Sequence, residues 1–463
     1  MSRIPVIAIF DVGKTNKKLF LFDEQYKLVH EESQAFEETK DEDGFPCEDL
    51  DALSTWVWKK FWEVSLRDHF KILGVNFSAY GASLVYLNDY RKPITPLYNY
   101  LKPFPEKLKK QFYDTYGGES IVAKQTASPV LGSLNSGLQF YRLKYEKPDI
   151  YHQVKYALHL PQYLSFIISA TATSDLTSIG CHTHLWDFRK QAYHDWVYKE
   201  GLQTKFPSIY NGDKTINIEA GGKKIPVGIG LHDSSAALIP YLAAFTEPFI
   251  LLSTGTWCIS LNPFNHSLLT DYELHQDCLC YLSYQGNPVK ASRLFAGYEH
   301  EQQVKRLAEH YHKSKDYYKT VKYDNVVLDK LQGVRSSKKV KHANGMIGQS
   351  AFKERDLSSF ENYETAYHQL ILDIILQQVQ STKIILNATH VKRIFVDGGF
   401  SQNHIYMHLL ATAFPAIEIF AANIPQASAF GAALALHDHW NKNLMPDDLI
   451  NLTLFKATEH ISL

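Results

Sequence analysis

A short polar turn between two apolar segments near the N-terminus places the strongest constraint on the fold. Residues 6–10 and 19–22 are apolar and predict two strands. The turn between them holds an acid, a glycine, hydroxyl and amide side chains, and three lysines. Backbone N–H groups and cations in such a turn can bind phosphate, and the carboxylate can bind a metal ion. A solvated hairpin turn is the alternative, because Asp, Gly, Thr and Asn are ordinary turn residues.

A second segment repeats this pattern about half the chain later. In residues 248–261 an apolar strand enters the turn Ser253-Thr254-Gly255-Thr256, and another apolar strand leaves it. Two similar phosphate-loop candidates, each at the head of its own half, indicate a duplicated domain that faces itself across a cleft.

Composition limits the classes of partner. The chain has 463 residues, enough for two or three domains, and its 45% hydrophobic and 21% charged residues describe a soluble globular protein. A net charge of −1 predicts neither a nucleic acid nor an acidic membrane surface as partner. We expect a cytoplasmic protein, because no signal peptide and no apolar run of about 18 residues is present. The five scattered cysteines fit a reducing compartment, and we expect Cys278 and Cys280 to be strand residues.

Predicted strands and helices alternate in both halves, which indicates an α/β fold. The clearest strands after the first hairpin are expected at 73–77, 225–230 and 393–396. The clearest helices are expected at 136–145, 162–169, 364–387 and 404–414.

Five motifs occur in the order found in the FGGY family of carbohydrate kinases, which the chain resembles from about residue 4 to about residue 440. They are Asp11-x-Gly13-x-Thr15-Asn16, His232-Asp233, Ser253-Thr-Gly-Thr-Trp257, Asp397-Gly-Gly-Phe-Ser-Gln-Asn403 and Ala427-Ser-Ala-Phe-Gly-Ala-Ala433. The resemblance implies the actin-like ATPase fold, an α/β fold with two ribonuclease-H-like domains facing a central cleft. It implies an N-terminal domain over 1–240, with the sugar side and the first phosphate loop. A C-terminal domain over 241–463 would carry the second phosphate loop and the adenosine site.

The resemblance also implies a role for each matching residue. Asp233 matches the catalytic base, Asp11 matches the acid associated with Mg²⁺, and both are expected at the metal ion. Tyr80, His232 and Asp233 are expected to bind the sugar. The residues expected to bind ATP come from both halves: Gly13, Lys14, Thr15, Gly255, Thr256, Gly398, Gly399 and Asn403.

Several of these residues have an ordinary structural alternative. Asp233 precedes Ser-Ser-Ala-Ala and would also suit a helix N-cap. Gly398 and Gly399 could serve only a tight turn between strand and helix. Lys14 stands where relatives usually have a small or hydroxyl residue, so it either contacts phosphate or is simply exposed.

The predicted activity is ATP-dependent phosphorylation of a ketose hydroxyl. The two phosphate loops look most like those of L-fuculose and L-rhamnulose kinases, which implies transfer to O1. Xylulose, ribulose, gluconate and glycerol stay open, because the chain departs from the family near the sugar. Relatives often carry an acid near the start of segment 78–81, and Trp/Tyr-x-Asp-x-Arg where this chain has Tyr98-Asn-Tyr-Leu-Lys102.

A rival from another class is a non-catalytic actin-like nucleotide-binding protein, which would keep the loops but need no base. His232-Asp233 at the family position argues against it. We therefore expect a sugar, ATP and Mg²⁺ as ligands, no nucleic acid or membrane partner, and an assembly compatible with a homodimer.

Overall fold

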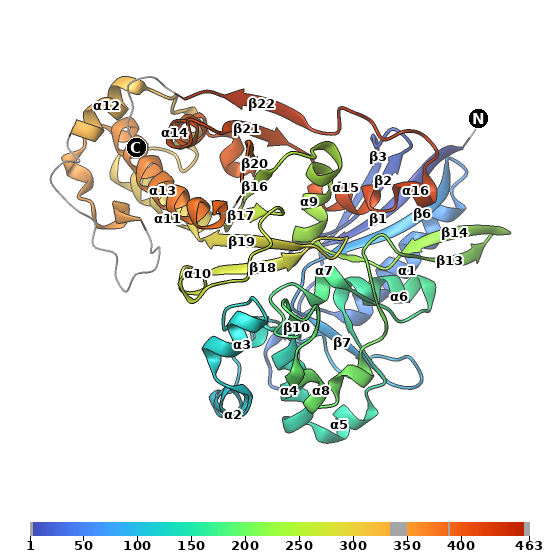
Figure 1. Ribbon diagram of the computed structural model, residues 1–463. Helices are drawn as coiled ribbons and strands as arrows, with labels where there is room; N and C mark the ends of the chain where they lie inside the picture. Colours follow the sequence, from blue (N-terminus) through green and yellow to red (C-terminus); the bar gives the residue numbers. More distant parts are fainter. Residues whose placement is uncertain (1–2, 334–349, 388, 458–463) are drawn as a thin grey trace. The chain divides into compact units, whose positions relative to one another are not determined.

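The computed structural model describes residues 3–333, 350–387 and 389–457 (Figure 1). The chain separates into two compact units, and neither is one uninterrupted stretch of sequence. Unit 1 comprises Met1–Ala244, Cys280–Pro288 and Pro425–Leu449. Unit 2 comprises Phe245–Leu279, Val289–Ile424 and Ile450–Leu463.

The predicted N-terminal hairpin lies at the centre of a seven-stranded sheet. β1 (Ile4–Val12) pairs antiparallel with β2 (Lys17–Asp23) and parallel with β6 (Phe70–Ala79). The register sets Asp11 opposite Ser78, so β1 and β6 end side by side. The order is β13-β14-β6-β1-β2-β3 with β15 also beside β6; the remaining bounds are β3 (Leu28–Gln34), β13 (Thr215–Ala220), β14 (Lys223–Gly228) and β15 (Leu231–His232).

A second seven-stranded sheet is built around the second predicted hairpin. β16 (Phe249–Thr254) pairs antiparallel with β17 (Cys258–Asn262) and parallel with β20 (Arg393–Gly398). The register sets Thr254 opposite Gly398. The order is β18-β19-β17-β16-β20-β21-β22; the remaining bounds are β18 (Cys278–Leu282), β19 (Pro288–Leu294), β21 (Glu418–Asn423) and β22 (Asn451–Phe455). Two mixed sheets with helices confirm the expected α/β fold.

The core of the first sheet is aromatic. Phe10 on β1 packs edge-on against Trp56 at 5.4 Å and stacks with Phe77 of β6 at 5.7 Å between ring centroids. Trp56 belongs to α1 (Leu50–Leu66), whose N-cap Asp49 accepts a hydrogen bond from the N–H of Ala52. Burial of these rings holds α1 against the sheet and fixes the strand end at Asp11.

The small-residue segment near the C-terminus forms α15 (Ala427–Leu434), which packs against α9 (Asp233–Ala244) and β1 within unit 1. In Figure 1 the red helix α15 lies beside the green helix α9. A Cβ atom on Gly431 would lie 1.8 Å from the backbone oxygen of Ala236, so only glycine permits this approach.

The four clearest predicted helices are confirmed, with ends that shift by a few residues at most. They are α4 (Ser136–Glu146), α6 (Leu160–Ser169), α13 (Tyr363–Leu386) and α14 (His404–Ala413). The other α-helices of the described residues are α2 (Glu106–Tyr116), α3 (Glu119–Gln125), α5 (Pro148–Gln153), α7 (Leu176–Ile179), α8 (Asp195–Lys199), α10 (Asp271–His275), α11 (Ala296–His310), α12 (Asn325–Gly333) and α16 (His437–Trp440). The described residues of unit 1 also form four two-stranded sheets. They are β4 (Thr39–Lys40) with β5 (Pro46–Cys47), β7 (Leu84–Leu87) with β8 (Tyr156–His159), β9 (Ser174–Asp175) with β12 (Ile209–Tyr210), and β10 (Trp186–Asp187) with β11 (Ala192–Tyr193).

Candidate functional site

The turn after β1 is closed by a backbone hydrogen bond and is exposed at its tip. The N–H of Gly13 donates to the carbonyl of Asn16 at 3.0 Å, which closes the turn, and Thr15 is exposed. Lys14 forms an ion pair with Glu38 at 2.7 Å between Nζ and Oε1. Lys14 therefore has a partner within the protein, and a phosphate contact would have to compete with Glu38.

Asp11 is a carboxylate held in place near the end of β1. Its Oδ2 accepts a hydrogen bond from Ser428 Oγ at 3.0 Å, so α15 helps to orient it. Burial raises the pKa of Asp11 to about 6; the hydrogen bond from Ser428 opposes this, and the charge of Asp233 adds to it. The two carboxylates are thus near enough for each to disfavour the other's charge, an arrangement that a divalent cation would relieve.

Asp233 begins α9 directly after β15, whose residue His232 lies opposite Ala79 in the parallel register with β6. Its Oδ1 accepts hydrogen bonds from the N–H of Ser234 at 2.6 Å and from Ser234 Oγ at 3.2 Å. An N-cap side chain instead accepts from the second or third helical residue. Burial raises the pKa of Asp233 to about 6, although 37% of the side-chain surface still faces solvent.

The two other residues expected at the sugar are buried and already have neighbours. The hydroxyl of Tyr80 points at Glu48, 3.5 Å from its Oε2, and Glu48 also pairs with buried Lys17 at 2.7 Å. His232 Nε2 lies 3.4 Å from Asp233 Oδ1. Tyr80 therefore lies among charges that already have partners, whereas His232 lies directly beside the carboxylate.

The turn between β16 and β17 exposes Gly255 and Thr256. The start of α11 supports it, because the N–H of Tyr298 donates to the carbonyl of Thr256 at 3.1 Å. A Cβ atom on Gly297 would lie 1.7 Å from the carbonyl oxygen of Gly255. Sequence reasoning missed Gly297, because a lone glycine in Ala-Gly-Tyr gives no signal until its neighbour in space is known.

The two glycines at the end of β20 differ in what they require. Gly398 has φ +85°, and a Cβ atom there would lie 2.0 Å from the carbonyl oxygen of Thr254. A Cβ atom on Gly399 would meet the same oxygen only at 4.0 Å. The tight-turn requirement thus belongs to Gly398, and Gly399 has open space beside it.

That open space is a cavity of about 1160 Å³ within unit 2. The residues that line it include the predicted Gly255, Gly399 and Asn403, together with the unpredicted Gly297. Unpredicted aromatic and imidazole side chains also line it: His300, Tyr318, Tyr323, Tyr367 and Phe400. Its size suits a nucleotide, and backbone without side chains on one wall lets a ligand approach closely.

A chain of hydrogen bonds runs along one wall of this cavity. Asn403 caps α14, because its Oδ1 accepts from the N–H of Tyr406 at 3.1 Å. Its Nδ2 therefore donates to the Tyr367 hydroxyl at 2.8 Å, and that hydroxyl lies 3.0 Å from His300 Nε2. Burial lowers the pKa of His300 to about 4, so the ring is neutral and Nε2 can accept the tyrosine proton. His300 then presents its remaining N–H at Nδ1.

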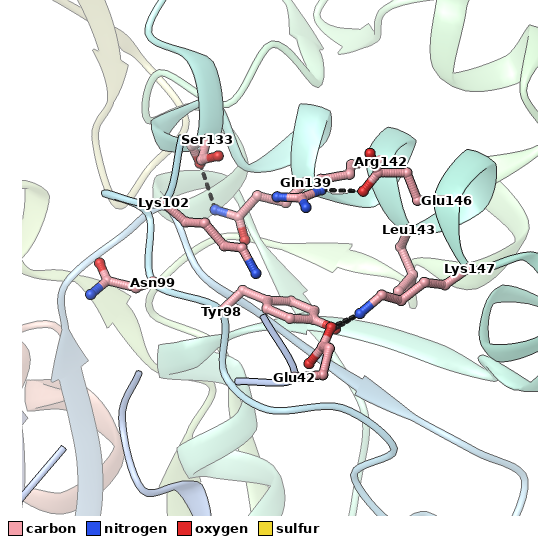
Figure 2. Close-up of a pocket in the computed structure, with 10 residues that line it drawn as sticks. All are labelled: Glu42, Tyr98, Asn99, Lys102, Ser133, Gln139, Arg142, Leu143, Glu146 and Lys147. Carbon is pink, nitrogen blue, oxygen red and sulfur yellow. Dashed lines mark hydrogen bonds and ion pairs between the residues drawn. The ribbon is translucent and has the colours of Figure 1, made fainter. Parts of the chain in front are cut away.

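The segment that departs from the family pattern lines a much smaller cavity, shown in Figure 2. Lys102 pairs with Asp41 and, at 2.6 Å, with Asp43, while Asn99 Nδ2 donates to the carbonyl of Pro46. The Tyr98 hydroxyl donates to Glu42 at 2.6 Å. The volume of about 30 Å³ holds roughly one water molecule. Lys102 and Asn99 thus bind the 41–48 loop, and this cavity cannot admit a sugar.

The predicted residues gather in two groups. Asp11, Tyr80, His232 and Asp233 lie in unit 1 with the turn of Gly13, Lys14 and Thr15. Gly255, Thr256, Gly398, Gly399 and Asn403 lie in unit 2. In the described part of the chain, no helix has both the length and the apolar character needed to cross a membrane.

The sequence matches two known domain families that together span most of it. Residues 6–240 match the N-terminal domain of the FGGY family of carbohydrate kinases, and residues 246–444 match the domain described as carbohydrate kinase FGGY, C-terminal domain. A rhamnulokinase from Halalkalibacterium halodurans is 23% identical over 266 residues, which are 54% of this chain and 54% of that protein. The matched region thus spans about half the length of this curated relative.

Solved structures share the fold at low identity. A carbohydrate kinase from Novosphingobium aromaticivorans superposes with a TM-score of 0.80 at 20% identity, over 98% of this chain and 95% of that one. Ligand-bound xylulose kinase from Lactobacillus acidophilus gives 0.77 at 14% identity, over 98% and 94%.

Proposed function

The chain belongs to the FGGY family of carbohydrate kinases, and we propose that it transfers the γ-phosphoryl group of ATP to a hydroxyl of a ketose. The observation that carries this proposal is the pair of carboxylates Asp11 and Asp233 at the ends of β1 and β15, two strands that both pair with β6 in unit 1. Burial raises the pKa of each to about 6, which suits one of them to accept a proton near neutral pH.

In this proposal Asp233 accepts the proton of the attacking hydroxyl. Among the described residues, Ser234 alone donates hydrogen bonds to this carboxylate, and both reach Oδ1. Oδ2 therefore stays available, and the partial exposure of the side chain gives a substrate access. His232, 3.4 Å away, would help to place the sugar hydroxyl beside it, and Tyr80 would bound the sugar on the β6 side.

Asp11 and Asp233 would hold Mg²⁺. The donors fit this ion, because carboxylate oxygens are its usual protein ligands and the two charges disfavour each other without a cation. When bound, Mg²⁺ supplies neutralisation of phosphate charge.

The turns that hold Gly13, Thr15, Gly255 and Thr256 would bind the phosphates, since Thr15, Gly255 and Thr256 are exposed, and Lys14 would contribute if it left Glu38. Gly399 and the cavity beside it would receive the nucleoside. Here Gly398 shapes the turn, and Asn403 acts through Tyr367 and His300.

For the sugar we propose a 6-deoxy-L-ketohexose, L-rhamnulose or L-fuculose, phosphorylated at O1. The phosphate-loop motifs support this choice, and so does the distant similarity to a rhamnulokinase. A cytoplasmic location and a homodimeric assembly stay predictions from the sequence.

The test is ADP release by purified protein with ATP and Mg²⁺ across L-rhamnulose, L-fuculose, xylulose, ribulose, gluconate and glycerol. We expect one 6-deoxy-L-ketohexose to give the highest kcat/KM, and phosphorus NMR of the product to place the phosphate on O1. ATP binding without turnover of any acceptor would favour the non-catalytic actin-like protein instead.

A further inference from the structure

A cluster of one thiol and two imidazoles lies next to Asp233 in unit 1. One ligand atom from each of Cys181, His182 and His232 lies within 4.8 Å of the other two. The shortest distance, 3.1 Å, joins Cys181 Sγ and His232 Nε2. Cys181 is fully buried and His232 is 4% exposed, whereas His182 is half-buried and gives the cluster one side open to solvent.

We propose that Cys181, His182 and His232 form a binding site for Zn²⁺ and that the bound ion inhibits the enzyme. A thiolate and neutral imidazoles are the ligands that Zn²⁺ selects, in a set of three that leaves a fourth position open. Mg²⁺ takes oxygen ligands, so this site is chemically distinct from the one at Asp11. Zinc binding would release the thiol proton of Cys181 to solvent.

The hydrogen bond of His182 is of the kind that zinc-binding histidines make. Its Nδ1 donates to the backbone carbonyl of Leu134 at 3.3 Å, which leaves the lone pair on Nε2. Metal-binding histidines usually donate their second N–H to a carbonyl or carboxylate in this way.

The elements that carry the ligands are fixed to each other by buried hydrogen bonds. The N–H of His232 donates to Thr177 Oγ1 at 2.9 Å, and Thr177 Oγ1 donates to Asp175 at 2.8 Å. This joins β15 to α7, which ends two residues before Cys181. Gly81 leaves room for the His232 ring, because a Cβ atom there would lie 2.6 Å from it. The cluster is therefore preorganised before any ion arrives.

Inhibition follows from the position of the catalytic base, and this part rests on the proposed function. Asp233 Oδ1 lies 3.4 Å from His232 Nε2, so an ion bound to that nitrogen would lie beside the carboxylate. The ion would also occupy the place where the sugar hydroxyl is proposed to lie.

Binding is tested without substrate, by competition between the protein and a chromophoric chelator for Zn²⁺ in a reducing phosphine buffer. The parent protein and Cys47→Ser should bind one ion, because Cys47 is also buried in unit 1 but lies outside the cluster. Cys181→Ser and His182→Gln should bind at least about tenfold more weakly. Equal affinity in all four proteins would overturn the site.

A second binding test uses Co²⁺ as probe. A thiolate charge-transfer band should appear in the parent and in Cys47→Ser and be absent from Cys181→Ser. A band that persists in Cys181→Ser would also overturn the site.

Inhibition is tested by titrating Zn²⁺ into the kinase assay at saturating Mg²⁺, with each variant compared with its own zinc-free rate. Parent and Cys47→Ser should be inhibited and recover with a chelator, while Cys181→Ser should resist. Equal inhibition of Cys181→Ser would overturn the inhibitory role. A protein without kinase activity would contradict the proposed function, while the chelator competition would still decide the zinc site.

Discussion

At the residue scale, the neighbouring glycines Gly398 and Gly399 differ in the space that is available beside them. The clearance of 4.0 Å beside Gly399 means that Gly399→Val should fold normally but fill the space where the nucleoside is proposed to bind. We expect ATP affinity to fall about tenfold or more, with sugar affinity unchanged, in calorimetric titrations of both ligands.

Gly398→Ala is the matched comparison. Its φ of +85° and the 2.0 Å approach to Thr254 should make that variant lose thermal stability by several degrees. Equal loss of ATP and sugar binding in Gly399→Val would indicate misfolding, and no loss would place the nucleotide elsewhere.

Asp233 carries the proposed proton transfer. Asp233→Asn keeps the shape of the side chain but cannot accept the proton, so kcat should fall about 10²- to 10⁴-fold. ATP binding, measured by calorimetry, should persist. Turnover within a few-fold of the parent would reduce Asp233 to a structural role at the start of α9.

The Tyr367 hydroxyl connects Asn403 to His300 through two hydrogen bonds. Tyr367→Phe should raise the KM for ATP about fivefold, which is the value of one hydrogen bond, and leave the KM for the sugar unchanged. Tyr363→Phe is the matched control: it lies one turn earlier on α13, and its buried hydroxyl has no hydrogen-bond partner among the described residues. A similar rise in both variants would point to loosened packing of α13 instead.

At the element scale, the contact between α15 and α9 depends on one glycine. Gly431→Ala would place a methyl group 1.8 Å from the Ala236 carbonyl and push the helices apart, so we expect a loss of about 1–3 kcal/mol in stability. Because Ser428 on α15 bonds to Asp11, catalysis should weaken as well. Gly399→Ala, which has room for its methyl, is the control in thermal melts. An unchanged melting temperature for Gly431→Ala would contradict this packing.

The elements themselves were largely predictable from sequence. Both hairpins and the long helices follow from strict apolar patterns, and the expected residues 6–10 and 364–387 lie within β1 and across α13. The return of α15 to unit 1 was not predictable, since nothing in a small-residue helix says which distant helix it packs against.

Motifs in the sequence predict one part of the candidate site, whereas another part depends on contacts between residues that are distant in the sequence. Asp11, Asp233 and Gly399 follow from ordered motifs, whereas the ion pair of Lys14 with Glu38 depends on the path of a loop. His300 and Tyr367 look like ordinary helix residues in the sequence. Only the fold shows that they share a hydrogen-bond chain with Asn403.

At the scale of the whole molecule, the two sheets repeat one plan. Each has a central strand with an antiparallel hairpin partner on one side and a parallel strand on the other: β1 with β2 and β6, and β16 with β17 and β20. In each, the polar turn follows the central strand, and the end of the parallel strand lies beside it. The two similar turns in the sequence therefore reflect the same arrangement of strands in both sheets.

Buried neutral histidines should make the folded protein sensitive to acid. His184 is fully buried; the Tyr113 hydroxyl lies 3.0 Å from its Nε2, and Thr126 Oγ1 lies 2.9 Å from its Nδ1. Burial lowers its pKa to about 3, with nearby His194 and His182 adding to the effect. In the unfolded chain the ring titrates near 6.5. Its stabilising contribution is therefore complete above pH 6.5 and is lost as the pH falls from there toward 3, because the unfolded state takes up the proton first.

The variant His184→Gln isolates this effect. Carboxylates with a raised pKa, such as Asp11, change the stability in the opposite direction with pH, but they do so equally in parent and variant and cancel in the difference between the two. Below pH 6.5, the free energy of unfolding of the parent should fall by up to about 1.4 kcal/mol per pH unit more than that of the variant. Scanning fluorimetry at pH 7.5, 6.5 and 5.5 should accordingly show the melting-temperature advantage of the parent shrinking toward acid. A constant or growing advantage would mean that His184 is already charged in the folded protein, or is solvated when it titrates.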